Sequence, residues 1–244
     1  MPRIPDSLHA LLSSVIDYAG LYPPAALPLP EVVENYEAYL AAADNWMLNR
    51  LVLPAAKLAE VRLGNDWRVS LLVDGEPGPL PAQVETLETK LPHRLSLPTY
   101  CEAPIAGIAG SAFVKVRTGG LTPEATPAAE ALAGFLGEAA ARRIAFKATA
   151  GLHHPLRSAG MHGFVNVLVA AVFAWHGAER GVILALLSET DGGAFQFFDN
   201  ELRWRGRSVT TAEVEGARRD FAHSFGSCSF EEPGADLRAL GWID

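Results

Sequence analysis

The sequence predicts one α/β domain over residues 1–244, arranged as a parallel (β/α)8-type barrel. Short apolar segments typical of buried strands alternate with segments of helical hydrophobic spacing. The strand-like segments number about eight, as in a closed barrel. No linker or internal repeat divides the chain. A hairpin predicted in the last third makes that part less regular. The alternative is an open doubly wound sheet, although no dinucleotide or P-loop motif follows a predicted strand.

The first half of the chain has its elements marked by apolar faces and turn residues. Pro30 at a first helical position, with Val32, Tyr36 and Leu40 on one face, predicts a helix. An Asp-Gly turn after residue 73 ends a buried strand. The predicted helices lie at residues 8–15, 30–40, 57–63 and 81–90. The predicted strands lie near Val15 and at residues 50–53, 69–73, 95–102 and 112–116.

The second half opens with a helix start made of a capping threonine, a proline and an acid at residues 122–124. The turn residues at 199–200 lie between two apolar segments and predict a hairpin. Thr210 and Glu213 match a capping box and predict a helix after it. The remaining predicted elements are helices at 164–175, 180–188 and beyond Pro233, and strands at 144–149 and near Phe225.

The composition limits the partners that we expect. The chain has 28 acidic against 20 basic residues and a net charge of −8, which repels a nucleic-acid backbone, and no dense basic patch offsets it. Cys101 and Cys228 do not make a disulfide framework. The first residues given show no apolar core of the length expected for a signal peptide, and the longest apolar run is too short to cross a bilayer, so we expect a cytoplasmic protein with a small-molecule partner. Whether it forms a homo-oligomer is left open by the sequence.

The residues most suggestive of chemistry lie at the predicted carboxyl ends of strands, where barrel enzymes carry their functional groups. The strand at 144–149 presents Lys147 and Thr149 on one face, and the loop after it carries His153 and His154. Core-building sequence seldom combines these residue types. The predicted catalytic residues are Lys115, Lys147, His153 and His154, and the predicted substrate-binding residues are Asp17, Tyr18, Glu102, Arg117, Thr149, Ser227 and Cys228.

The leading hypothesis is an enzyme that acts on a small carboxylate- or phosphate-bearing metabolite by a lyase or isomerase step. Lys147 on a barrel strand would face a dry interior, which lowers its pKa and makes the neutral amine a base or a Schiff-base former. Lys115 and Arg117 share one face of their strand and would bind the anion. His153 or His154 would carry a proton, because imidazole titrates near neutral pH.

Two other functions stay open. A metal-dependent hydrolase would use His153, His154 and His162 with a carboxylate from Glu102 or Asp17, a common ligand set for zinc or iron. The histidine spacing matches no standard metal-binding motif such as HExxH, so the sequence favours no particular cofactor. A divalent metal is the cofactor that this second hypothesis would require. A non-catalytic small-molecule-binding or assembly module would leave these side chains scattered over the surface.

The segment around Ser227 and Cys228 is rich in small and hydroxyl-bearing side chains, which would line a cradle for an anion. Cys228 would act as a nucleophile if an adjacent cation lowered its pKa. The simpler interpretation is a buried cysteine that behaves as a small hydrophobe.

Two short motifs are similar to those of enolase-type barrel enzymes, namely Lys115 with Arg117 two residues later, and the Glu-Glu-Pro sequence at 231–233. The chain is too short for that family's capping domain and lacks its three metal-binding acids. No residue role is assigned from this resemblance.

Overall fold

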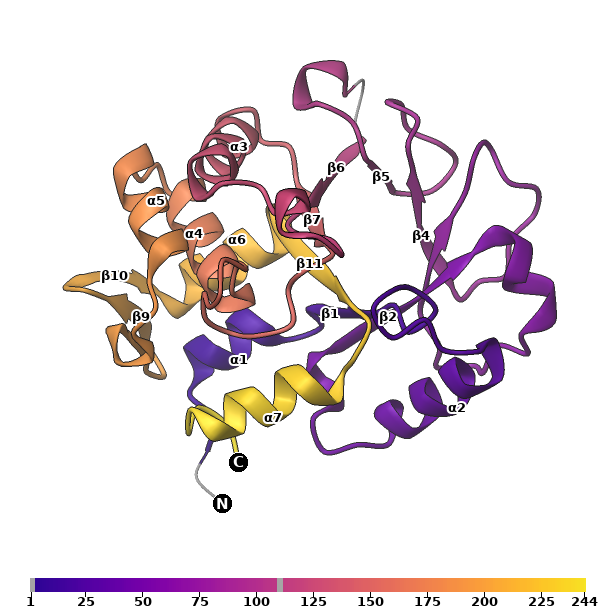
Figure 1. The fold of residues 1–244 in the computed structure, drawn as a ribbon, viewed down its shortest axis with the longest axis horizontal. Coiled ribbons are helices and arrows are strands. Elements are labelled where there is room, and N and C mark those ends of the chain that lie inside the picture. The colour runs from indigo at the N-terminus through magenta and orange to yellow at the C-terminus, as the bar shows by residue number, and fades with distance from the viewer. Residues whose placement is uncertain (1–2, 109–111) are drawn as a thin grey trace.

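The computed structural model describes residues 3–108 and 112–244, and within them eight parallel strands close into a barrel (Figure 1). The strands follow chain order around the barrel, and the first pairs with the last, so no edge is left open. The (β/α)8-type prediction is therefore confirmed, and the open doubly wound alternative is wrong. The barrel strands are β1 (Ile16–Tyr18), β2 (Leu48–Pro54), β3 (Val69–Leu72), β4 (Val84–Thr89), β5 (Thr99–Cys101), β6 (Phe113–Arg117), β7 (Phe146–Thr149) and β11 (Ala222–Ser227).

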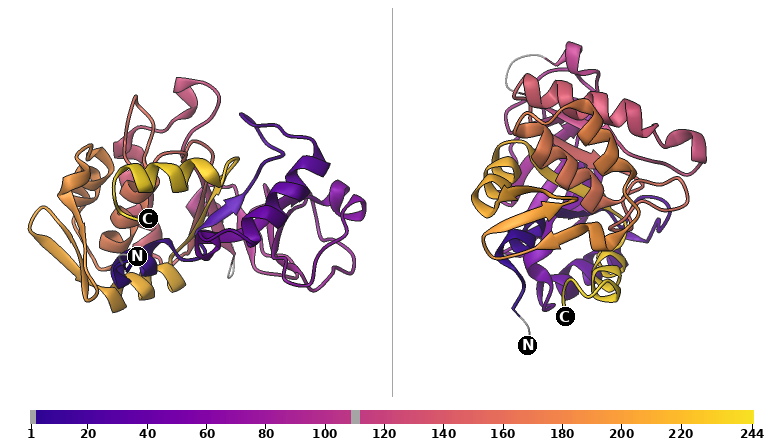
Figure 2. Two further views of the ribbon diagram at one scale, coloured as in Figure 1. Left: turned by 90° about the horizontal axis from the view of Figure 1, so that it is seen from below. Right: turned by 90° about the vertical axis from the view of Figure 1, so that its left-hand side faces the viewer.

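The helices cover the barrel unevenly. Figures 1 and 2 place α3 to α6 on one side, whereas the connections between β2 and β5 on the other side contain loops and one short 3-10 helix. The longest helix in the described ranges has 13 residues, and none there is long and apolar enough to cross a bilayer. The helices are α1 (Asp6–Leu12), α2 (Leu29–Leu40), α3 (Ala129–Ala141), α4 (Phe164–Trp175), α5 (Arg180–Ser188), α6 (Thr211–Asp220) and α7 (Glu231–Ala239). The 3-10 helices are Asn45–Met47, Ala55–Glu60, Ile105–Gly107, Pro123–Ala125 and Gly192–Ala194.

Helix α4 is buried on all sides from Phe164 to Ala174. It packs between α3, α5 and α6 on its outer sides and β11 on its inner side. This position explains why the helix is apolar around its whole circumference, because no face of it is left in water. Asn166 is the exception, and its amide donates to the carbonyls of Leu186 and Glu189, which ties α4 to the end of α5.

The helix predicted at residues 81–90 is wrong, because this segment forms the barrel strand β4. Valine and threonine at positions 84, 86 and 89 favour a strand. The side chains of Thr86 and Glu88 point into the polar interior of the barrel, whereas Leu87 between them packs in the apolar core. Successive side chains thus point to opposite faces, as they do in a strand. The closed barrel requires a strand between β3 and β5, and this tertiary pairing overrides the helical spacing.

Two other helix predictions are correct in place but wrong in extent. The segment at 57–63 forms only the 3-10 helix Ala55–Glu60. The start at residues 122–124 produces a 3-10 helix, and α3 begins at Ala129. Pro127 separates the two, since proline disfavours the α conformation of the preceding residue and supplies no amide hydrogen.

The predicted hairpin is confirmed, and it forms part of a three-stranded antiparallel sheet between α5 and α6. Its strands are β8 (Phe195–Phe197), β9 (Glu201–Trp204) and β10 (Arg207–Thr210). The third strand was not predicted, because its turn uses Arg205 and Gly206, both with positive φ, rather than a typical Asn-Gly pair. The predicted capping box of Thr210 and Glu213 is present at the start of α6.

Candidate active site

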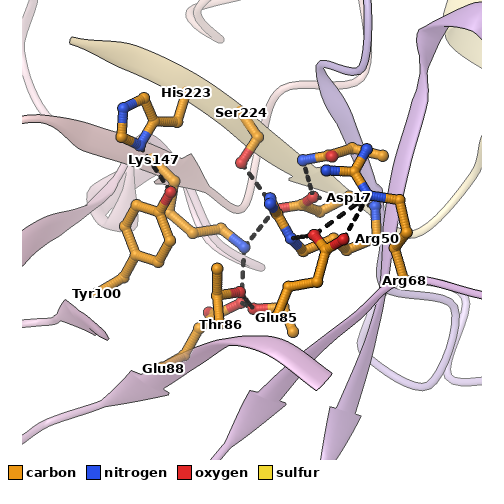
Figure 3. Close-up of polar contacts among 12 residues, drawn as sticks. Asp17, Arg50, Arg68, Glu85, Thr86, Glu88, Tyr100, Lys147, His223 and Ser224 are labelled. Carbon is orange, nitrogen blue, oxygen red and sulfur yellow. Dashed lines mark hydrogen bonds and ion pairs between the residues drawn. The ribbon is translucent and has the colours of Figure 1, made fainter. Parts of the chain in front are cut away.

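The interior of the barrel is charged. Barrel interiors are usually filled by layers of branched apolar side chains. Here β1, β4 and β7 contribute Asp17, Glu88 and Lys147, none of which is more than 2% exposed. The Lys147 ammonium lies 2.5 Å from Asp17 Oδ2 and 2.6 Å from Glu88 Oε1 (Figure 3). A buried cation is thus paired with two carboxylates from different sides of the barrel. Such pairing is expected because an unpaired charge is costly to bury.

Polar side chains from neighbouring strands hold each carboxylate in place. Asp17 accepts hydrogen bonds from Asn49 Nδ2 and Ser224 Oγ, each at 2.7 Å. Glu88 accepts one from Ser70 Oγ, also at 2.7 Å. These bonds orient the carboxylates toward the lysine and satisfy oxygen atoms that water cannot reach.

The expectation that burial lowers the pKa of Lys147 below its usual range is wrong. Burial does act in that direction, but the negative charges of Asp17 and Glu88 and their hydrogen bonds outweigh it and raise the pKa. Burial likewise acts to raise the pKa of Glu88, but Lys147 and Lys115 lower it to about 2. Lys147 is therefore a fixed cation at neutral pH, and its amine is not available as a base.

A cavity of about 410 Å³ opens above this network, at the carboxyl ends of the strands. Lys115 reaches into it from β6, in register with Lys147, and its ammonium lies 3.4 Å from Glu88 and 3.2 Å from Glu102. Arg117 follows at the rim, 3.9 Å from Glu102, with 55% of its side chain exposed. Cations and carboxylates therefore alternate from the barrel interior to solvent. The charged groups that line the cavity are Lys90, Lys115, Arg117, Lys147, Glu88 and Glu102.

Tyr22 closes one side of the cavity from the loop after β1. Its hydroxyl is buried and has no hydrogen-bond partner among the described residues. Burial, and to a lesser degree the charge of Glu88, raises the pKa of Tyr22 to about 12, so the phenol keeps its proton at neutral pH. A buried hydroxyl without a partner is unfavourable, and in this position it is available to donate a hydrogen bond to a ligand.

Another wall of the cavity is formed where the loops after β6 and β7 meet. A Cβ added to Gly119 would lie 2.8 Å from the Cα of Gly151, so no larger residue fits. Gly151 also has a φ of +78°, which glycine adopts without strain. Thr118 Oγ1 donates to the carbonyl of Ala150 at 2.6 Å. These contacts fix the loop that follows Arg117 and the loop that carries His153.

The three histidines lie in three different environments. His153 lines the cavity, and its Nδ1 is 3.3 Å from Glu232 on α7. His154 turns away, with its Nδ1 2.6 Å from Asp236. His162 is buried, and its Nε2 bonds to a backbone carbonyl at 2.8 Å. The alternative metal set of His153, His154, His162 and Glu102 is therefore not assembled, and within residues 3–108 and 112–244 no cluster of three or more His, Cys, Asp or Glu has metal-binding geometry.

The other predicted residues divide between the cavity and the surrounding core. Thr149 and Cys228 line the cavity. Burial raises the pKa of the Cys228 thiol, which does not suit a nucleophile. The Tyr18 side chain points outward from β1, away from the barrel interior, and its hydroxyl accepts a hydrogen bond from Asn35 on α2 at 3.2 Å. Ser227 is buried and accepts a hydrogen bond from the next residue but one.

Sequence analysis missed Glu88 and assigned no role to Tyr22. Glu88 was placed on a predicted helix, although the valine and threonines around it indicated a strand. For Tyr22, no local pattern in the sequence shows that its hydroxyl lacks a partner. Asn49, Ser70 and Ser224 interrupt otherwise apolar strands, and this interruption is the available signal that those strands face a polar interior.

No family model, curated protein or solved structure matches this chain. The fold and the groups around the cavity are therefore the grounds for a functional conclusion.

Proposed function

We propose that the protein is an enzyme that binds a small carboxylate- or phosphate-bearing metabolite in this cavity. The reaction is a lyase or isomerase step that begins with proton transfer beside a carbonyl. The observation that carries the proposal is the charge of the cavity, where four cations face two carboxylates in a chain of net charge −8. An acidic protein that concentrates cations in one cavity favours an anionic ligand there.

The anionic group of the ligand is bound at the rim. Arg117 is more than half exposed, and its one ion pair with a described residue is the 3.9 Å contact to Glu102, so most of its guanidinium donors are available for a bidentate contact. Lys115 adds a second positive charge lower in the cavity. Tyr22 donates its hydrogen bond to a ligand oxygen, which gives its buried hydroxyl a partner.

His153 is the proton acceptor in this proposal. The contact of its Nδ1 with Glu232 favours the tautomer with the proton on that nitrogen, which leaves Nε2 as a base. Removing a proton from the carbon beside the carbonyl places negative charge on the carbonyl oxygen. Lys115 and Lys147 supply fixed positive charge near that oxygen, and Tyr22 supplies a hydrogen bond, which together stabilise the transition state.

Solvent deuterium exchange tests the proposal directly. Full-length protein is incubated in D2O with a panel of 2-oxo acids and phosphorylated ketoses, and deuterium uptake beside the carbonyl is followed by NMR. We expect uptake above the spontaneous rate for at least one compound, lost in His153→Gln. The matched control is His154→Gln, because the neighbouring histidine lies outside the cavity.

Two outcomes would count against the proposal. Binding of these compounds without deuterium uptake would indicate a non-catalytic binding module. Equal loss of uptake in both histidine variants would show that His153 is not the specific proton acceptor.

A further inference from the structure

A second cavity lies at the opposite end of the barrel. Its volume is about 650 Å³, and its lining comes from the beginnings of strands rather than from their ends. Arg68 directly precedes β3, Phe113 is the first residue of β6, and His223 is the second residue of β11. The charged interior with Lys147 lies between the two cavities, because strand ends line the first and strand beginnings line the second. Figure 3 shows Arg50, Arg68 and Glu85 on the Asp17 side of the Lys147 ammonium.

Cations dominate this second cavity. Its lining contains four arginines and two glutamates, namely Arg50, Arg68, Arg218, Arg219, Glu85 and Glu215. Arg50 Nε lies 2.9 Å from one oxygen of Glu85, and Arg68 Nε lies 3.0 Å from the other. The Glu85 carboxylate therefore pairs with the guanidinium groups of both arginines and holds them next to each other.

The outer nitrogens of these two arginines are open to the cavity. For both Arg50 and Arg68 the side-chain hydrogen bonds to described residues involve Nε alone. The remaining guanidinium N–H groups have no protein acceptor within those residues. Two adjacent planar groups with unused donors match the geometry of a carboxylate or a phosphate.

Arg218 adds a buried positive charge beside them. Its side chain is 9% exposed, and it donates to the backbone carbonyls of Ser13, Ala222 and His223. Its Nε has no hydrogen-bond partner among the described residues. The guanidinium forms no ion pair with a described carboxylate, and the charge of Asp17 acts on it only through space. Burial lowers the pKa of Arg218 to about 10, so the group is still charged at neutral pH. A buried charge without a counter-ion is unfavourable, and an anion in this cavity would offset that cost.

Tyr100 and His223 form a neutral part of the cavity wall. Tyr100 donates to His223 Nδ1 at 2.7 Å, and His223 Nε2 donates to the carbonyl of Arg219 at 3.1 Å. Burial and the charge of Arg218 lower the pKa of His223 to about 4. Arg219 pairs with Asp220 at the surface, and the Glu215 carboxylate in the lining forms no ion pair with another described residue. The donors that face an incoming ligand are thus those of Arg50 and Arg68.

We infer that this cavity is a second anion-binding site, which holds a small phosphate- or carboxylate-bearing molecule through Arg50 and Arg68. The site does not depend on the proposed function of the first cavity. It is linked to that cavity through β2, because the Arg50 amide and the Asn49 side chain both donate to Asp17. The residue proposed to bind the anion therefore also helps to hold, through its backbone, the carboxylate that pairs with Lys147.

Isothermal titration calorimetry at low ionic strength tests the site, with inorganic phosphate and citrate as separate probes of the full-length protein. We expect saturable binding of at least one probe, weakened about tenfold or more in Arg50→Gln and in Arg68→Gln, because each removes charge-assisted hydrogen bonds. Tighter binding of phosphate would assign the phosphate class, and tighter binding of citrate the carboxylate class. The Arg68 side chain is 39% exposed, so its replacement tests the site even if Arg50→Gln unfolds the protein.

Two controls locate the bound anion. Arg142→Gln removes an exposed arginine from the end of α3 and should leave the affinity unchanged. Arg117→Gln alters the first cavity and should also retain this binding event. Loss of affinity in Arg117→Gln with full affinity in the Arg50 and Arg68 variants would place the ligand in the first cavity and overturn the inference. Absence of saturable binding for both probes would overturn it as well.

Discussion

Lys147 on β7 and Asp17 on β1 form an ion pair of 2.5 Å across the seam where the barrel closes. Strand β11 lies between their two strands, and its Ser224 donates to the same Asp17 oxygen. Lys147 also contacts Glu88 on β4, which is on the far side of the barrel. One buried ammonium therefore joins the first, fourth and seventh strands of the barrel. These contacts give Lys147 a structural role that does not depend on catalysis.

Replacing this lysine should be strongly destabilising. Lys147→Met leaves Asp17 and Glu88 buried without their cation, and we expect a loss of about 3–5 kcal/mol in the free energy of unfolding. Urea denaturation followed by circular dichroism measures it. Lys57→Met removes an exposed lysine paired with Glu60 and should change stability little. Equal effects of the two substitutions would contradict the structural role of Lys147.

The contribution of Glu88 to stability should depend on pH in the acid range. Lys147 and Lys115 lower its pKa from 4.5 to about 2 against the opposing effect of burial. A carboxyl whose pKa is lower in the folded state stabilises the protein above its unfolded pKa, and this contribution is lost as pH falls through the folded value. The stability difference between wild type and Glu88→Gln should therefore be constant above about pH 5 and shrink toward about pH 2. Denaturation curves across this range measure it, and a difference independent of pH would contradict the shift.

Removal of the Tyr22 hydroxyl should affect ligand binding rather than stability. Tyr22→Phe deletes a buried hydroxyl that has no partner among the described residues, so the melting temperature should stay the same or rise. Oxalate, a planar anion that resembles the enolate of a 2-oxo acid, should bind about tenfold more weakly if Tyr22 donates to it. Calorimetric titration of oxalate measures this change.

Tyr36→Phe is the matched control for this prediction. The Tyr36 hydroxyl lies within hydrogen-bond distance of the carbonyls of Asn49 and Arg68, away from the cavity at the strand ends. Its removal should cost about 1 kcal/mol of stability and leave oxalate affinity unchanged. A Tyr22→Phe variant that binds oxalate like the wild type would remove Tyr22 from the site.

Gly119→Ala should separate the loops after β6 and β7. The added Cβ would lie 2.8 Å from the backbone of Gly151, which cannot yield as a flexible side chain would. We expect a loss of about 1–3 kcal/mol in stability together with weaker oxalate binding, because Arg117 and His153 flank this contact. Gly75→Ala meets nothing within 4 Å and is the control. Thermal melts measure the stability of the two variants, and calorimetric titrations measure their affinity for oxalate. Equal stability and equal oxalate affinity in the two variants would contradict the close approach of Gly119 to Gly151.

The sequence by itself determined the architecture. Alternating strand and helix segments, with about eight strands, predicted the barrel, and the apolar pattern located most elements close to their final positions. It also predicted that polar groups gather at the strand ends, since Lys115, Arg117, Lys147, Thr149, Glu102, His153 and Cys228 all line the cavity. These features depend on local periodicity and on the shared direction of parallel strands, both of which can be inferred from one chain.

Only the tertiary structure decided which of those groups are paired and which are available. Glu88 meets Lys147 because barrel closure brings β4 opposite β7, and this pairing makes the lysine a fixed cation instead of a neutral base. His154 and Tyr18 leave the site because adjacent residues point in different directions, toward α7 and α2 in these two cases. Electrostatic interactions depend on distances across the barrel and on exclusion of water, and neither quantity is encoded in the spacing of residues along the chain.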